Sequence, residues 1–318
     1  MSYPHMFVRS FVCLLALGIT SNLSAQKPVD APEAEVGSEI VVELIEAGNA
    51  PHRQLRFTPK LGDKLSKVMS MKMSQVVTVG GQQPPQVELP GQKMYMDMEV
   101  TNVDPNGDID FQYSYVDIEV VSDPDNPSPI AAQMESMLDP MIGTKGTATI
   151  TSRGLTKKSN LEISEDLNPM IKSMIDGMKD SMNKLSSPLP EEAVGVGGKW
   201  RTVQQLNANG ISLEQTSTYE VTKLDSSSFT LSITVDQHAA PQEVKNAMLP
   251  PGAVMKLKTL DTKGEGTSRF ELNNILPKSS TVSMNSTTSM SISVAGQNQE
   301  MTTDMNVEMT LDDAPEKQ

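Results

Sequence analysis

The chain has 318 residues, and its 40 acidic residues outnumber 26 basic ones, which gives a formal net charge of −14. This acidic balance argues against a nucleic-acid partner, because neutralising phosphates requires a basic surface. The single cysteine, Cys13, excludes a disulfide framework.

The first 25 residues have the order of a secretory signal. Arg9 precedes the apolar run 11–19, and small residues lead to Ala25. The run is too short for a membrane span, which needs about 20 apolar residues. We therefore expect residues 1–25 to be a cleaved signal peptide, the protein to be periplasmic or secreted, and no integral membrane span.

Both ends of the chain that follows the signal peptide are polar, and between them apolar and polar residues alternate. Residues 26–39 read as a flexible leader and 312–318 as a disordered tail. The alternation is clearest in Met94–Val100, Phe229–Val235 and Met301–Leu311. Side chains of a strand point to opposite faces in turn, so these runs predict strands with one buried face. One-sided burial favours antiparallel pairing.

One segment has the period of a helix. It begins with Asn168 and Pro169, which suit a helix N-terminus, and it ends before Pro188. The predicted amphipathic helix covers residues 168–186. Its apolar face includes Ile171, Met174, Ile175, Met178 and Met182.

Short sequence matches recur in the same order in the two halves of the chain, and they predict an internal duplication. The pairs are Gly62–Leu65 with Gly197–Trp200, Glu99–Asp104 with Glu220–Asp225, Met137–Pro140 with Met248–Pro251, and Thr144–Gly146 with Thr262–Gly264.

The duplication and the strand pattern together predict a mainly β domain over residues 40–311. Its expected parts are repeat one (about 55–165), the helix (168–186), repeat two (about 190–280) and a closing hairpin (283–311). We expect a large, curved, half-barrel-like antiparallel sheet. The central helix should cover its concave side, because an apolar sheet face must be buried against another layer.

The segment Ile45–Phe57, followed by Gly62-Asp63, resembles an uncharacterised family of exported bacterial proteins, a domain of unknown function. Members share an "AGxxPxRxLRF…GD" opening, a Met-rich hairpin and an "LP…VGxxW" segment, here Leu189-Pro190 with Val196–Trp200. The resemblance covers most of residues 40–311 and implies no activity or site residues. The expected architecture is also similar to the half-barrel of LolA-type periplasmic lipoprotein carriers, as an analogy of fold alone.

Motifs for catalysis and metal binding are weak. His238 lies two residues from Asp236, but this spacing is common on one strand face and no serine elbow accompanies it. Gly195–Lys199 lacks the Ser or Thr of a phosphate loop and predicts a tight turn before a strand, with Trp200 in the core. The acidic residues of 104–110 lack the distal Glu of a calcium loop. We predict no catalytic residue, no metal site and no cofactor.

Methionine is unusually frequent, with 22 residues in the chain. Three runs each place methionines on one strand face: Met69, Met71, Met73; Met94, Met96, Met98; and Met301, Met305, Met309. Three interpretations fit these residues. They can be ordinary core, or they can line a deformable apolar pocket, since Met adapts to varied shapes. They can also form a Cu(I) site, since thioethers are soft ligands.

The sequence therefore predicts an exported, non-enzymatic envelope protein that binds an apolar small molecule or lipid between sheet and helix. The expected lining is the three methionine runs with Ile171, Met174 and Met178. The alternatives are a purely structural or protein-interaction module and, third, Cu(I) binding. The sequence indicates no particular protein partner.

Overall fold

The computed structural model describes residues 40–82, 86–122, 128–162, 188–208, 210–244, 252–294 and 297–315. Most of them lie in strands, so the predicted mainly β fold is confirmed. The predicted signal peptide (1–25), the predicted leader (26–39) and the predicted helix (168–186) lie outside the described residues.

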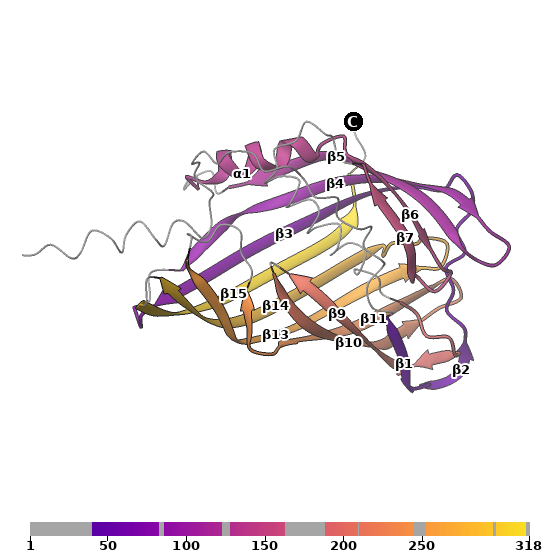
Figure 1. The fold of residues 1–318 in the computed structure, drawn as a ribbon. Helices are drawn as coiled ribbons and strands as arrows, with labels where there is room; N and C mark the ends of the chain where they lie inside the picture. The colour runs from indigo at the N-terminus through magenta and orange to yellow at the C-terminus, as the bar shows by residue number, and fades with distance from the viewer. Residues whose placement is uncertain are drawn as a thin grey trace, which may run out of the picture.

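A 13-stranded antiparallel sheet dominates the fold and curves strongly (Figure 1). In spatial order its strands are β1 (Val41–Glu46), β9 (Lys199–Ala208), β10 (Ile211–Leu224), β11 (Ser228–Ala239), β13 (Val254–Glu271), β14 (Ser279–Val294), β15 (Gln297–Asp313), β3 (Lys64–Val79), β4 (Val87–Val103), β5 (Ile109–Val121), β6 (Lys145–Ile150) and β7 (Thr156–Leu161). The short β12 (Gln242–Val244) pairs with β13. A separate two-stranded sheet joins β2 (Asn49–Arg53) and β8 (Val194–Val196).

The described helical residues form α1 (Ala131–Leu138) and the 3-10 turn η2 (Asp139–Met141). Helix α1 lies beside β5 at the top of Figure 1. Neither helical element is long and apolar enough to cross a membrane.

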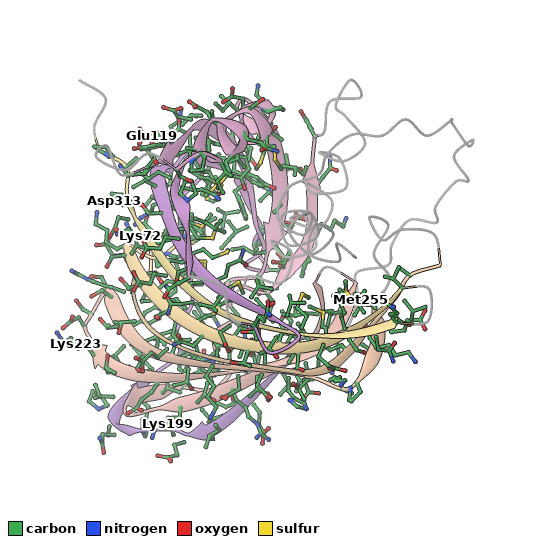
Figure 2. The ribbon with its side chains drawn as sticks, turned by 90° about the vertical axis from the view of Figure 1, so that its left-hand side faces the viewer. Lys72, Glu119, Lys199, Lys223, Met255 and Asp313 are labelled. Carbon is green, nitrogen blue, oxygen red and sulfur yellow. The ribbon has the colours of Figure 1, made fainter. Side chains whose placement is uncertain are left out.

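Strand alternation gives the sheet an apolar inner face and a polar outer face. On β14, Val282, Met284 and Ile292 lie on the inner face, while Ser283, Asn285 and other small polar residues lie on the outer face. Register shifts interrupt several ladders, as between Leu257 and Thr259, and such bulges bend a strand. In Figure 2 several sulfur atoms, drawn in yellow, lie inside the curve.

Buried apolar residues of the inner face form two clusters. The first contains the aromatic residues, including Trp200 at 0% exposure and the stacked pair Phe229 and Phe270, with ring centroids 5.0 Å apart. The prediction that Trp200 is core is therefore confirmed. The second contains no aromatic residue among the described positions; its buried members are Ile211, Leu213, Ala239, Val244, Met255, Leu257, Leu260, Ile292 and Met301.

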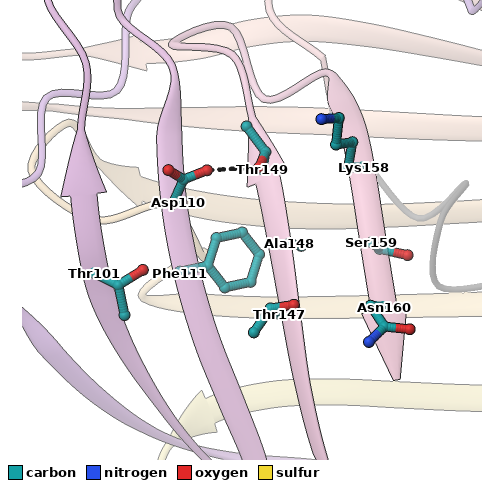
Figure 3. A pocket seen from close by; sticks show the side chains of 9 residues that line it. All are labelled: Thr101, Asp110, Phe111, Thr147, Ala148, Thr149, Lys158, Ser159 and Asn160. Carbon is teal, nitrogen blue, oxygen red and sulfur yellow. Dashed lines mark hydrogen bonds between the residues drawn. The ribbon is translucent and has the colours of Figure 1, made fainter. Parts of the chain in front are cut away.

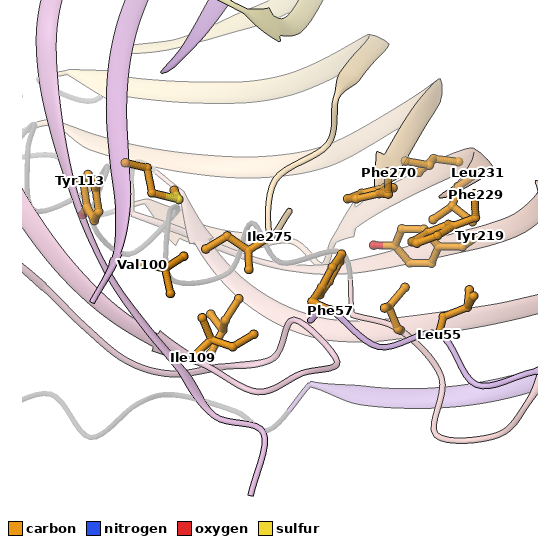
Figure 4. Packing of buried hydrophobic residues seen from close by; sticks show 14 of the residues in the cluster. Leu55, Phe57, Val100, Ile109, Tyr113, Tyr219, Phe229, Leu231, Phe270 and Ile275 are labelled. Atoms are coloured by element: carbon orange, nitrogen blue, oxygen red, sulfur yellow. The ribbon is translucent and has the colours of Figure 1, made fainter. Parts of the chain in front are cut away.

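The chain segment around Leu55 and Phe57 fills the end of the sheet that holds the first cluster. Leu55 is 0% and Phe57 is 3% exposed. The Phe57 amide donates to the Ser152 carbonyl at 2.8 Å, and the Thr58 amide donates to Leu272 at 2.6 Å. In Figure 4, Phe57 lies between residues of the β4–β5 side and residues of the β10–β13 side. This end of the inner face is therefore closed by an aromatic core.

Two segments that carry the family resemblance contact each other directly. Arg56 donates from Nη1 to the Pro190 carbonyl at 2.9 Å and from Nη2 to the Glu191 carbonyl at 2.7 Å. Trp200 Nε1 donates to the Pro188 carbonyl at 2.9 Å. The shared motifs therefore assemble the closed end of the sheet, which is a structural role.

The sequence-matched turns at the start of β3 and β9 have the same geometry. Gly62 donates to the Val100 carbonyl at 2.9 Å, and Gly197 donates to the Val221 carbonyl at 2.7 Å; their φ angles are +84° and +81°. Two residues after each of these glycines, equivalent side chains also pair. Ion pairs there join Lys64 to Glu99 at 3.7 Å and Lys199 to Glu220 at 3.5 Å.

The predicted ends of the closing hairpin are too short. Strand β14 begins at Ser279 rather than residue 283, and β15 continues to Asp313, two residues past the expected end of the hairpin at residue 311. The physical reason at the second end is an ion pair: Asp313 accepts from Lys67 at 2.6 Å and also contacts Lys278. This contact fixes the last residues of the strand.

Candidate functional site

The three predicted methionine runs lie on three adjacent strands, β4, β3 and β15, and all face the inner side. Met69 is in register with Met94, and Met71 is in register with Met309. Met301 is in register with Met290 of β14. The structure thus brings the methionines of three distant segments onto one surface, which we call the methionine face.

The methionine face is only partly covered. Met94, Met98 and Met301 are buried, with exposures of 8%, 5% and 4%. The other members are half-buried: Met69, Met71, Met73, Met96, Met305 and Met309. The predicted helix residues Ile171, Met174 and Met178 lie outside the described residues, so their position against this face stays a prediction.

A row of polar side chains crosses the inner face, which the sequence alone did not reveal. We call it the polar row; its polar members, in register across seven neighbouring strands, are Gln204, Gln215, Gln237, Thr262, Ser286 and Gln75, with Met305 of the methionine run between Ser286 and Gln75. The available signal was a set of glutamines at positions where the alternation calls for apolar residues. That signal becomes a pattern only when the strand order is known.

One charged pair lies on the inner face at the end of β3 and β15. Lys67 is 1% exposed and donates to Asp313 Oδ1 at 2.6 Å and to the Lys278 carbonyl at 3.4 Å. Burial raises the pKa of Asp313, but hydrogen bonds from Lys278 and Lys67 outweigh it and leave the pKa below its usual value. The same contact raises the pKa of Lys278.

Two tyrosines of β5 lie in the first cluster near the methionine face. Burial raises the pKa values of Tyr113 and Tyr115, so both phenols are neutral at physiological pH. Their rings meet edge to face at a centroid distance of 6.2 Å. They contribute apolar surface rather than a proton-transfer group.

The histidine positions give no catalytic arrangement. His238 Nδ1 lies 3.1 Å from Asp261 Oδ1, not from Asp236, and both side chains are largely exposed on the outer face. His52 Nε2 lies 2.9 Å from the Gly48 carbonyl and is exposed in β2 rather than in a loop. His52 lies in a strand because residues 49 to 53 pair with β8.

The other weak motifs have structural roles. Residues Gly195–Lys199 form the end of β8, a turn and the start of β9, which confirms the predicted turn before a strand. In the hairpin of residues 104–110, Asp108 pairs with Lys157 at 2.5 Å, and Asp110 accepts hydrogen bonds from Thr149 and Asn102. Among the described residues, no group of three or more His, Cys, Asp or Glu is arranged to hold a metal ion.

A pocket of about 490 Å³ lies over β4 to β7 (Figure 3). It is lined by Thr101, Asp110, Phe111, Thr147, Ala148, Thr149, Lys158, Ser159 and Asn160. Hydrogen bonds from Thr149 and Asn102 lower the pKa of Asp110, so this carboxylate is ionised and already paired. None of the predicted methionines lines this pocket, so it lies apart from the methionine face.

Comparison with known proteins identifies one family. Residues 172–274 match DUF6263, a family of unknown function. The match confirms the predicted resemblance to a domain of unknown function. The DUF6263 region includes β9 to β13 and the second motif segment, whereas the opening around Leu55 lies outside it.

A search of curated proteins finds no match to the chain. One similar solved structure is an anion-selective porin from Comamonas acidovorans. The two sequences are 8% identical, the alignment covers 78% of this chain and 100% of the porin, and the TM-score is 0.22. Pseudomonas aeruginosa OpdQ has 8% identity, 79% and 99% coverage and a TM-score of 0.18. The outer membrane protease OmpT from Escherichia coli has 8% identity, 82% and 99% coverage and a TM-score of 0.15. Similarity at this level supports no inference about function.

Proposed function

We propose that this protein is an exported, non-enzymatic binding protein that holds an apolar ligand, such as a lipid acyl chain, against the methionine face. The observation that carries the proposal is the alignment of three methionine runs on adjacent strands. Together they supply a continuous, half-buried apolar lining. The predicted helix 168–186 is the proposed cover on the other side of the ligand.

The chemistry of the lining supports this choice over a rigid core. Methionine is unbranched and polarisable, so a methionine surface adapts to a flexible chain. Apolar sites with a small number of placed polar groups are the usual form of a ligand pocket. The first cluster holds Met94 and Met98 beside the aromatic residues, with Met69 and Met96 packed against it, and the second cluster holds Met301. The half-buried Met71, Met73, Met305 and Met309 belong to neither cluster, so they are the part of the lining that is least engaged in core packing.

Copper binding is the second candidate, and one observation favours it. Directly opposed residues on neighbouring strands have Cβ atoms about 5 Å apart, so the pairs Met69–Met94 and Met71–Met309 each bring two thioethers together. Two soft sulfur ligands can form part of a Cu(I) site. The nearest argument against it is the lack of His or Cys in these runs.

A purely structural or protein-interaction role is the remaining alternative, and the aromatic end of the sheet supports it. We also propose that the two halves arose by internal duplication. The equivalent turns and ion pairs at the starts of β3 and β9 support this origin.

The experiment is a parallel titration of the mature protein with a fluorescent fatty acid and with Cu(I) against a chelating competitor. We expect saturable lipid binding that Met71→Asp weakens at least tenfold. Ser70→Asp is the matched control, because Ser70 is the neighbour of Met71 on the outer face. Met71→Leu should keep the binding.

Tight stoichiometric copper without lipid binding would reverse the ranking of the two ligands. If neither ligand binds and native mass spectrometry of protein from its own host finds no co-purifying lipid, the structural alternative stands.

A further inference from the structure

One end of the main sheet is an edge strand with exposed apolar side chains. Among the described residues, β1 stands at the end of the strand order and pairs with β9 alone (Figure 1). Its other edge carries backbone N–H and C=O groups that no described strand pairs with. Val41 is 59% exposed and Ile45 is 49% exposed. An open edge of this kind can accept a further strand from another chain.

The two faces of β1 have different environments. Val42 and Leu44 are half-buried and pack against the first cluster, so they lie on the inner face. Val41, Glu43 and Ile45 alternate with them and are exposed on the outer face. The outer face of this edge therefore presents two apolar side chains with one glutamate between them.

The residue order of β1 is complementary to itself. When two copies of β1 pair antiparallel with Glu43 opposite Glu43, Val41 of each copy lies opposite Ile45 of the other. On the inner face, Val42 then lies opposite Leu44. Directly opposed side chains interact most strongly across a strand pair, so this register joins apolar residues on both faces. A register shifted by two residues would instead place Glu43 opposite Val41 or Ile45.

The two central glutamates are compensated in this register. Arg201 donates from Nε to Glu43 Oε2 at 2.9 Å, and its Nη2 lies 2.8 Å from the same oxygen. Two like charges that are directly opposed are unfavourable when they stand alone. Across a twofold axis, however, each carboxylate keeps its own guanidinium on the side away from the axis.

Two other occupants fit this edge less well. Strand β7, at the other end of the sheet, has two lysines but no exposed apolar side chain, and Lys157 already pairs with Asp108. Pairing of β1 with β7 of another copy would also be head to tail, which builds an open-ended chain. Residues 26–39 precede β1 and contain Pro28 and Pro32, and proline has no N–H to donate to a ladder.

We propose that the mature protein forms a symmetric dimer in which the two β1 strands pair antiparallel with Glu43 at the twofold axis. The two main sheets then form one continuous sheet, and each copy covers the open edge of the other. Val41 and Ile45 become buried against each other across the axis. The dimer does not rest on the proposed ligand, because the methionine face lies on β3, β4 and β15.

Sedimentation velocity of residues 26–318 over a concentration series tests the assembly. We expect a dimer that dissociates on dilution. Ile45→Lys should raise the dissociation constant about tenfold, because twofold symmetry repeats the change at two apolar contacts. Val121→Lys is the matched control, because Val121 is a 44% exposed apolar residue at the end of β5. It should leave the dissociation constant unchanged.

Cysteine crosslinking tests the register. The only cysteine of the chain, Cys13, precedes residue 26, so an introduced cysteine is the single thiol of the test protein. Glu43→Cys places two thiols opposite each other, with Cβ atoms about 5 Å apart, and should give a disulfide-linked dimer on mild oxidation. Val41→Cys is the matched control, because its two thiols would lie roughly 14 Å apart along the strands, too far for a disulfide.

Three results would overturn the proposal. The first is a protein that stays monomeric up to about 100 μM, where an interface of micromolar affinity would be largely occupied. The second is an assembly larger than a dimer, which would favour head-to-tail pairing with β7. The third is a dissociation constant that Ile45→Lys leaves unchanged, or equal crosslinking of the two cysteine variants. Circular dichroism of each variant checks that the sheet is intact.

Discussion

Removing the negative charge of Asp313 should expose the cost of burying Lys67. The Lys67 side chain is 1% exposed, whereas that of Asp313 is 45% exposed, so the pair lies at the boundary between core and solvent. Breaking a fully buried pair by removing one partner costs about 3–5 kcal/mol. Because water reaches the Asp313 carboxylate, we expect a smaller loss of about 2 kcal/mol for Asp313→Asn, near the range for a hydrogen bond to a charged group.

Urea unfolding of the mature protein, followed by circular dichroism, measures this loss. Asp312→Asn is the matched control, because Asp312 is the exposed neighbour and faces the outer side. Lys67→Met places an apolar side chain beside Met69 and Met96, and in that background Asp313→Asn should cost less than about 0.5 kcal/mol. Equal stability of the two asparagine variants, or no coupling between positions 67 and 313, would refute the reasoning.

The pH dependence of stability follows from the same pair. The pKa of Asp313 is lowered in the folded protein, so its contribution is present above the ordinary aspartate value of 3.8 and is lost as the pH falls through the folded value. Acid unfolding of Asp313→Asn should lack this component. An acid-unfolding curve that keeps the wild-type shape would contradict the assignment.

Three further predictions concern the core, the sheet and export. Leu55→Ala should cost about 2–5 kcal/mol because the side chain is fully buried, whereas Leu61→Ala at a 70% exposed site should be nearly neutral in the same urea assay. Gly266→Ala would place a Cβ 2.5 Å from a backbone oxygen of β14 and should cost about 1–3 kcal/mol; Gly91→Ala, with its nearest atoms at 3.6 Å, is the tolerated control in thermal unfolding. Intact-mass analysis of protein from its own host should show a chain that starts at Gln26, and a product that retains Met1 would exclude signal cleavage.

Local patterns predicted the strands because the period of two is a property of each strand by itself. The alternation through Met94–Val100 and Met301–Leu311 marks strands that the structure contains as parts of β4 and β15. The long-range pairing was not predictable in the same way. Met71 and Met309 become neighbours only because β15 pairs with β3, and no local signal specifies that pairing.

The buried ion pair and the polar row escaped prediction for a related reason. Lys67 occupies an apolar position in the alternation of β3, but its partner is 246 residues away. Gln215 and Gln237 occupy apolar positions in the alternation of their strands, but each strand alone does not show which residues lie beside them. Their role depends on which strands are adjacent and which face the curve encloses, and both are properties of the assembled sheet.

The pairing of β15 with β3 also sets an order of events during synthesis. Strand β3 is made more than two hundred residues before its partner β15, so its edge has no partner while the intervening strands emerge. Exposed strand edges rich in apolar residues promote association between chains, and contacts between distant segments form slowly. The β15–β3 pairing that joins the two halves of the sheet can form only after the β14–β15 hairpin has been synthesised. Until then the unpaired edge of β3 is open to association with another chain.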